Sequence, residues 1–383
     1  MKKEDITGMI VYILILGIAI VFGLTVLQEY SKTIHMEQAH FIALVVGALL
    51  TGVVFNASIF ELAHVLGAKI GRYDIISVNI LGCCWYKVDG KTKFKFSSFD
   101  GFTGETKINP KSNVEKEPNP SPYLLFGTLF YIVEILVVIL GFSFLTINKD
   151  LVLNNIGYFL LIVGIIGGLI LVYNIMPFKL DSANDGYRLT MTTNAKNKIA
   201  FNELLRVENA IASGDPSIEI KTFDQITNFT AELNLNKVYL LLEDKKYSEA
   251  EELLDVILNG KSELTPKVYI RARAQKIYIN LITKPLEEAA IYYKKEVSVQ
   301  ESREISNDIS MPCIRTYILM AGLLDKSRSE TVLALNKVLK AYKRTPKKRQ
   351  AVERRLYNEA LNMVIAAHPS WELEGYLLAD TNQ

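Results

Sequence analysis

The sequence predicts a mainly α-helical protein: a polytopic membrane domain of four spans with a small β-rich insertion, followed by a soluble α-helical domain. Half of the 383 residues are hydrophobic, yet 22% are charged, which is near the usual share in soluble proteins. The charged residues are sparse before Lys179 and dense after it. From Lys198 to Leu378, apolar residues recur at three- and four-residue spacing, the period of amphipathic helices. A membrane half joined to a water-soluble half explains all three observations.

Four apolar runs come close to the roughly 20 residues that a membrane-spanning helix needs. They cover residues 9–27, 40–60, 123–145 and 153–176. No small-residue cleavage site follows the first run, so we expect an uncleaved anchor rather than a signal peptide. The predicted domains are an anchor span and link (residues 1–38), a membrane core (39–190) with its β-rich insertion (about 73–110), and a helical domain (198–383).

Basic residues predict the orientation of these spans, because loops rich in Lys and Arg stay cytoplasmic. The loop between the second and third spans holds nine of them, whereas the two links on the opposite side hold only Lys32 and Lys149. We therefore expect a multi-pass protein of the cell membrane with both termini cytoplasmic. The net charge of +2 gives no reason to expect a nucleic-acid partner, and three cysteines give no disulfide framework.

The insertion has the composition of a small sheet. Residues 75–88 and 91–96 are rich in β-branched and aromatic side chains, and the Asp-Gly pair between them is a strong hairpin signal. A second Asp-Gly pair at residues 100–101 and a short strand toward Ile108 complete the predicted sheet. Two interpretations stay open: a cytoplasmic cap, or an edge strand that holds an extended peptide by β-augmentation.

The candidate site begins at the end of the second span, where Glu61 and His64 lie one helical turn apart. Residues 60–64 have the frame of the His-Glu-x-x-His zinc motif, with Phe60 in the first histidine position. In that motif the two histidines share a helix face and hold Zn²⁺, and the glutamate takes a proton from the metal-bound water. Glu-x-x-His alone is a weak signal, and the same residues can simply cap a span at the membrane interface.

A second segment strengthens the case more than a hundred residues later. Asn174 and Pro177 close the fourth span, and Asp185 and Gly186 follow. Together with the motif at the second span, this segment resembles the site-2 protease family of intramembrane zinc metallopeptidases. That family pairs a His-Glu-x-x-His helix with a later Asn-x-x-Pro and Asp-Gly segment. The resemblance covers about residues 39–189, and it makes Asn174, Pro177 and Gly186 supporting residues of the site.

The resemblance implies that His64 and Asp185 bind zinc and that Glu61 is the general base. This sequence departs from the family pattern at two points. Phe60 cannot bind a metal, whereas a catalytic zinc site normally keeps three protein ligands. The gap that precedes Asp185 is a few residues longer than is usual in the family, so Asp181 is the second choice for the acidic ligand.

Glu134 lies inside the third span, where an ionisable side chain is a candidate functional residue by default. It either approaches the site and compensates for Phe60, or hydrogen-bonds to a neighbouring helix. Structural alternatives also exist for the later segment. Asn174 and Pro177 can shape a helix end, because proline breaks helices, and Asp185 can be a plain turn residue.

The soluble domain contains a loose repeat. Residues 246–250 are echoed by residues 285–289 and more weakly by residues 329–332, and each copy leads into an amphipathic helix. The pitch of about forty residues is irregular for tetratricopeptide repeats of about 34, but the pattern resembles a helical-hairpin solenoid of that type. Such stacks bind proteins on a concave surface. The alternative is a generic helical bundle.

Two functional hypotheses follow. In the first, the chain is a site-2-protease-like homologue with impaired or lost zinc catalysis, which lies in the lipid bilayer and binds membrane peptides or partner proteins. The helical domain would then bind a protein partner. In the second, it is an active intramembrane zinc protease with non-standard metal ligation, which cleaves a membrane-anchored or short peptide. Loss of one of three ligands costs much of the metal affinity, so we favour the first.

Overall fold

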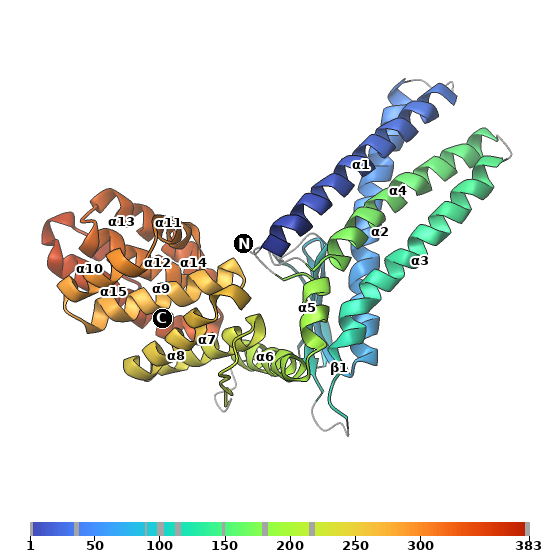
Figure 1. The fold of residues 1–383 in the computed structure, drawn as a ribbon. Coiled ribbons are helices and arrows are strands. Elements are labelled where there is room, and N and C mark those ends of the chain that lie inside the picture. Colours follow the sequence, from blue (N-terminus) through green and yellow to red (C-terminus); the bar gives the residue numbers. More distant parts are fainter. Residues whose placement is uncertain are drawn as a thin grey trace. The chain divides into compact units, whose positions relative to one another are not determined.

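The computed structural model describes residues 3–33, 38–88, 90–97, 103–111, 116–147, 150–177, 183–213 and 219–379. These residues are mainly helical, with a small antiparallel sheet (Figure 1). It divides into two compact units, Met1–Leu205 and Arg206–Gln383. Each unit has a hydrophobic cluster of its own.

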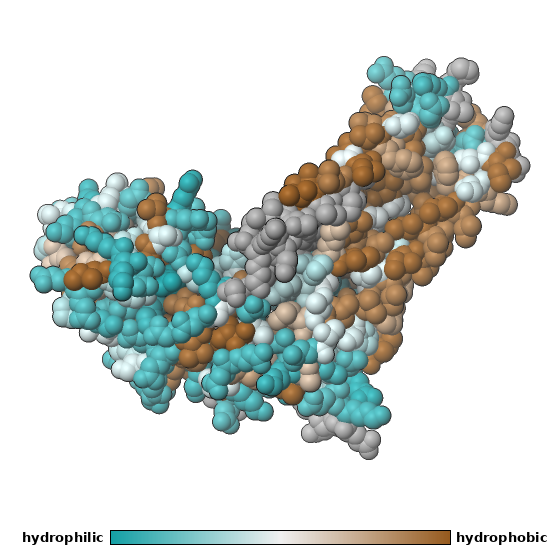
Figure 2. Space-filling view, in the orientation of Figure 1, coloured by the Kyte–Doolittle hydropathy of each residue, from teal (hydrophilic) through white to brown (hydrophobic). Residues whose placement is uncertain are grey.

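Four long helices lie in the described part of the first unit. They are α1 (Lys3–Thr33), α2 (Gln38–Ile70), α3 (Pro120–Ile147) and α4 (Leu151–Ile175). Within the part of the chain that is described, α2, α3 and α4 are long and apolar enough to cross a membrane. Apolar side chains also cover much of the surface of this bundle (Figure 2), which indicates a membrane protein. Several side chains of α1 lie outside the described part, and the count of four spans stays a prediction.

Small residues let these helices approach one another closely, as is usual in membrane bundles. A Cβ at Gly164 of α4 would lie 2.7 Å from Val138 Cγ1 of α3, and a Cβ at Gly67 of α2 would lie 2.3 Å from the Pro122 carbonyl oxygen of α3. A larger residue at either position would force the helices apart. The end of α2, where the candidate site lies, is therefore held firmly against α3.

The sheet follows α2 and has the strand order β3-β2-β1-β4, with every neighbouring pair antiparallel. Its strands are β1 (Tyr73–Ile80), β2 (Cys83–Val88), β3 (Lys91–Phe96) and β4 (Gly104–Pro110). β3 lies at one edge, and all of its residues are exposed. Of the two edge strands, β3 is therefore the one that is exposed along its whole length, whereas β4 is partly buried.

The structure corrects one detail of the predicted sheet. Residues 75–88 form two strands rather than one, because the chain turns at Leu81 and Gly82, which have φ values of 49° and 92°. Glycine adopts such positive φ values without strain. The run of β-branched and aromatic residues on both sides hides this turn. Residue 89 and residues 100–101, where turns were predicted, lie outside the described residues.

Two further helices follow α4. α5 (Asp185–Thr192) belongs to the first unit, and α6 (Ala195–Ser213) crosses the division between the units. The helices of the second unit are α7 (Asn228–Glu243), α8 (Tyr247–Asn259), α9 (Pro266–Thr283), α10 (Leu286–Glu296), α11 (Val299–Asn307), α12 (Met311–Leu319), α13 (Arg328–Leu335), α14 (Val338–Arg344) and α15 (Lys347–Ala367). Because α12 packs against α9, α11, α13 and α15, it lies at the centre of this unit.

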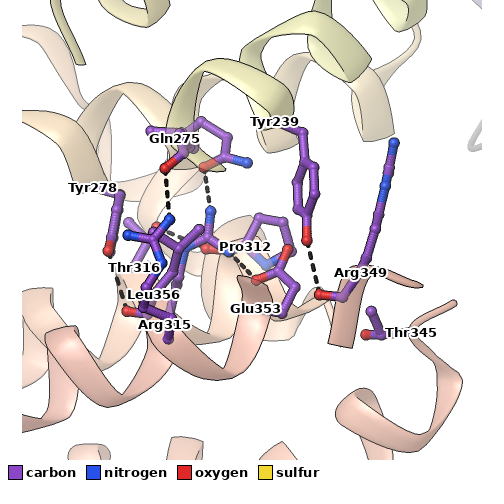
Figure 3. A network of polar contacts seen from close by, with 12 residues as sticks. Tyr239, Gln275, Tyr278, Pro312, Arg315, Thr316, Thr345, Arg349, Glu353 and Leu356 are labelled. Carbon is purple, nitrogen blue, oxygen red and sulfur yellow. Dashed lines mark hydrogen bonds and ion pairs between the residues drawn. The ribbon is translucent and has the colours of Figure 1, made fainter. Parts of the chain in front are cut away.

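A buried polar network lies inside this second core (Figure 3). Arg315 on α12 is fully buried and pairs with Glu353 of α15 and Gln275 of α9. Its guanidinium lies 4.7 Å from the centre of the Tyr278 ring. Because a buried charge without its partner is costly, this network favours one arrangement of α9, α12 and α15.

The three repeat-like segments of the sequence all lie at helix starts. α8 begins at Tyr247, α10 at Leu286 and α13 at Arg328. The helices differ in length from one copy to the next. The repeat architecture itself stays a prediction.

Candidate functional site

The structure brings His64, near the end of α2, against Asp185, the first residue of α5. These residues are 121 positions apart in the sequence, and His64 Nε2 lies 3.0 Å from Asp185 Oδ2. The His64 and Asp185 side chains are only 6% and 14% exposed. The paired side chains are therefore largely buried, and the role of the two residues as zinc ligands stays a prediction.

Asn184 fixes the start of α5 against the end of α4. Its Oδ1 accepts a hydrogen bond from the Tyr187 backbone N–H at 3.0 Å, so Asn184 is the N-cap of α5. Its Nδ2 donates to the carbonyl oxygens of Tyr173 and Met176, both at 2.6 Å. One side chain thus satisfies three backbone groups and positions Asp185 beside α2.

Gly186 allows this close approach. A Cβ there would lie 2.4 Å from the Asn174 carbonyl oxygen, which leaves no space for a side chain. The Asn174 side chain donates to the Ile170 carbonyl oxygen of its own helix at 3.0 Å, and Pro177 is exposed just after α4. These residues shape the junction of α4 and α5. Asp181 lies outside the described residues.

The environment of Asp185 keeps its carboxyl group ionised. Burial alone would raise its pKa, but the charge and hydrogen bond of His64 and the charge of Arg188 lower the pKa below the usual range. An ionised carboxylate favours a proton on His64 Nε2. The other ring nitrogen, Nδ1, is buried with no hydrogen-bond partner among the described residues, and it lies 3.9 Å from Glu61 Oε2.

Glu61 is held by the sheet. It is 2% exposed, and its two carboxylate oxygens accept hydrogen bonds from the hydroxyl groups of Thr103 at 3.0 Å and Thr106 at 2.7 Å. The Tyr123 hydroxyl of α3 in turn donates to the Thr106 carbonyl oxygen at 2.9 Å. The glutamate therefore lies in a fixed position, one helical turn before His64.

The Phe60 side chain packs among aromatic rings and aliphatic side chains. Its ring meets the His64 ring edge to face, with centroids 4.3 Å apart, and stacks on the Tyr131 ring at 5.7 Å. Tyr131 and Leu171 form a buried cluster with it. A Cβ at Gly127 would lie 2.5 Å from Phe60 Cε2, so the glycine makes room for the ring.

The residues present do not match the ligand set of a catalytic zinc site. Such sites normally have three protein ligands, and His64 Nε2 and Asp185 Oδ2 supply two. The described residues contain no group of three or more His, Cys, Asp or Glu side chains arranged to hold a metal ion. Phe60, at the position of the third ligand, has no donor atom.

Glu134 does not lie beside this pair. Its Oε2 and the Asn56 Oδ1 both lie over Gly167 of α4, 2.8 Å and 2.6 Å from the position of a Cβ there. Asn56 precedes His64 by eight residues on α2, which corresponds to about 12 Å along the helix. Glu134 thus belongs to a separate polar position deeper in the bundle.

Sequence reasoning missed the residues that hold the site in place. Thr103 and Thr106 reach Glu61 from more than 40 residues away, and no local pattern marks them. Asn56 could have been identified from the sequence, because a polar residue inside an apolar span is a candidate functional residue. Asn184 stands directly before the predicted Asp-Gly pair.

Comparisons with protein-family models, with curated proteins and with solved structures give no match. The resemblance to the site-2 protease family therefore rests on the motifs and on their order along the chain.

Proposed function

We propose that this chain is a catalytically silent, site-2-protease-like membrane protein that binds membrane peptides or partner proteins. In this proposal, residues 39–190 form the membrane core, both termini are cytoplasmic, and the helical domain binds a protein partner as a repeat-like scaffold. The order of the motifs along the chain and the close pairing of His64 with Asp185 support the family resemblance.

The packing of the Phe60 ring is the main observation in support of a loss of catalysis. A third metal ligand at this position would need a donor atom near His64 and Asp185. Here the ring packs against His64, Tyr131 and Leu171, and Gly127 accommodates it. Packing of this kind supports a stable apolar position rather than a site that awaits a metal.

The edge strand β3 supports the binding part of the proposal. β3 pairs with β2 on one side and with no strand of the sheet on the other. An extended peptide can add to such an edge through main-chain hydrogen bonds. The exposed rings of Trp85, Phe94 and Phe96 lie along β2 and β3 and would contact apolar side chains of that peptide.

Zinc content tests this proposal. The full chain, purified in detergent and dialysed against trace zinc, is expected to carry far less than one zinc per molecule, as measured by inductively coupled plasma mass spectrometry. The variant Phe60→His restores a third donor and is expected to raise the zinc content. Phe60→Leu, which keeps an apolar side chain, is the matched control and should leave it unchanged.

The active-protease alternative predicts the opposite result. Stoichiometric zinc in the wild-type protein that is lost in both His64→Ala and Asp185→Ala would contradict the proposal. A Phe60→His variant that is folded yet binds no zinc would instead argue against the family resemblance itself.

A further inference from the structure

The strongest unexplained feature lies halfway across the membrane bundle, on the helices that carry the candidate site but away from it. Both carboxylate oxygens of Glu134 and the Oδ1 of Asn56 are buried and have no hydrogen-bond partner among the described residues. Glu134 is 14 residues from the start of α3 and 13 from its end. That places it about 20 Å from either end of the helix.

The orientation of the Asn56 amide is fixed. Its Nδ2 donates to the carbonyl oxygens of Gly52 at 2.8 Å and Val163 at 3.1 Å. If the amide were rotated by 180°, its oxygen would point at these two carbonyl oxygens and both hydrogen bonds would be lost. The Tyr131 hydroxyl donates to the Asn56 backbone oxygen at 2.9 Å and is therefore already used. Oδ1 is left as an acceptor that needs a donor.

Gly167 shows that this acceptor and the Glu134 carboxyl group meet at one place. A Cβ at Gly167 would lie 2.6 Å from Asn56 Oδ1 and 2.8 Å from Glu134 Oε2. With no side chain on Gly167, the two oxygens share the space above the α4 backbone. Two bare acceptors at such a position repel each other, and a buried acceptor without a donor costs stability.

Within the described part of the chain, no ion pair compensates a negative charge on Glu134. α3 and α4 contain no Lys, Arg or His. The titratable residues of the elements packed against α3 are His40, Glu61, His64 and Lys69 on α2, Tyr158 and Tyr173 on α4, and Asp185, Tyr187 and Arg188 on α5. The cation on α2 that is nearest to Asn56 in sequence is His64, about 12 Å away along the helix.

We propose that Glu134 is a proton-binding site inside the membrane bundle, and that its protonated carboxyl group donates a hydrogen bond to Asn56 Oδ1. A proton at this place removes the uncompensated charge and supplies the missing donor in one step. A neutral carboxylic acid has one O–H donor, and Asn56 Oδ1, which has no hydrogen-bond partner among the described residues, can accept it. In this proposal the site binds a proton. The alternative is that it binds a monovalent cation such as Na⁺.

Labelling with dicyclohexylcarbodiimide tests the proposal, because this apolar reagent modifies protonated carboxyl groups within membranes. The full chain in detergent is treated near neutral pH, and the modified residue is identified by peptide mass spectrometry. We expect modification of Glu134, a loss of modification as the pH is raised, and no modification of Asp150, an exposed carboxylate at the start of α4. Protection of Glu134 by Na⁺ at constant pH would overturn the proton assignment in favour of a cation site.

Thermal unfolding keeps the proposal testable even if the reagent does not reach Glu134. Glu134→Gln retains a donor for Asn56 Oδ1 and should unfold at nearly the wild-type temperature near neutral pH. Glu134→Leu removes the donor and should lower the midpoint by several degrees. If Glu134 were ionised, the glutamine variant would be more stable than the wild type, because it removes a buried charge, and that result would overturn the proposal.

Two glycine variants test the meeting point itself. Gly167→Ala places a methyl group 2.6 Å from Asn56 Oδ1 and 2.8 Å from Glu134 Oε2, and it should lower the midpoint strongly. Gly168→Ala, the next residue on the same helix, is the matched control, because its Cβ would meet only Ile135 Cδ1 at 3.8 Å. Equal midpoints for the two variants would contradict the close approach of Asn56 and Glu134 on which the proposal depends.

Discussion

At the scale of single residues, the candidate site depends on hydroxyl groups as much as on its acids and its imidazole. Thr103 and Thr106 each donate to the Glu61 carboxylate, and the latter contact is 2.7 Å long. Hydrogen bonds to charged groups contribute more than neutral ones, and their loss leaves the acceptor buried and unpaired. The position of Glu61 is therefore set from the sheet as well as from its own helix.

We expect Thr106→Val to lower the free energy of unfolding by about 1–3 kcal/mol, because valine keeps the shape and removes the donor. Thermal or denaturant unfolding of the full chain in detergent, followed by circular dichroism, measures the change. Thr92→Val, on the exposed edge strand, is the matched control and should leave stability unchanged. An equal effect of the two variants would mean that the bond to Glu61 contributes nothing.

The sequence reveals some of these residues and hides others, for a physical reason. Hydropathy alone marks α2, α3 and α4, because a span must be apolar along its whole length. These three helices correspond to the last three of the four predicted runs, and the first run, residues 9–27, lies in α1. The order of two motifs suggested the meeting of His64 and Asp185. In contrast, the contact of Thr106 with Glu61 depends on how the sheet packs on α2, and neither the residue types nor their spacing in the sequence predicts it.

At the scale of elements, a charge cluster joins α8 to the end of α9. Glu251 of α8 lies 3.3 Å from Lys276 Nζ and 3.0 Å from Lys284 Nζ. Burial alone would raise the pKa of Glu251, but the hydrogen bonds and charges of these two lysines lower the pKa below its usual range. The folded protein therefore binds this proton less readily than the unfolded chain does.

This difference predicts how stability depends on pH. The contribution of Glu251 is fully present above its unfolded pKa of about 4.3 and is lost as the pH falls through the lower, folded value. Because the cluster is partly exposed, we expect Glu251→Gln to cost at most about 1 kcal/mol near neutral pH and progressively less in acid. Denaturant unfolding as a function of pH measures this.

The neighbouring residue supplies the control for that experiment. Glu252→Gln changes the charge of the helix by the same amount at an exposed position. It should alter stability little at any pH. A cost for Glu251→Gln that stayed constant into strong acid would show that the loss is one of packing rather than of charge.

At the scale of the whole molecule, the chain joins two units that bury their apolar residues in separate clusters. The large cluster of the second unit runs from Ala231 to Leu373. The small cluster around Phe60 and Tyr131 belongs to the membrane bundle. A unit whose core is contiguous and complete within itself has what it needs to fold alone.

We therefore expect residues 219–383, expressed alone, to be soluble without detergent and to unfold cooperatively with a helical circular dichroism spectrum. The buried Arg315–Glu353 pair distinguishes this native fold from a collapsed one. Glu353→Gln leaves the Arg315 charge buried without its counter-ion and should cost about 3–5 kcal/mol, whereas exposed Glu249→Gln should cost almost nothing. A fragment that aggregates, or that is indifferent to Glu353→Gln, would show that the second unit needs the rest of the chain to reach its fold.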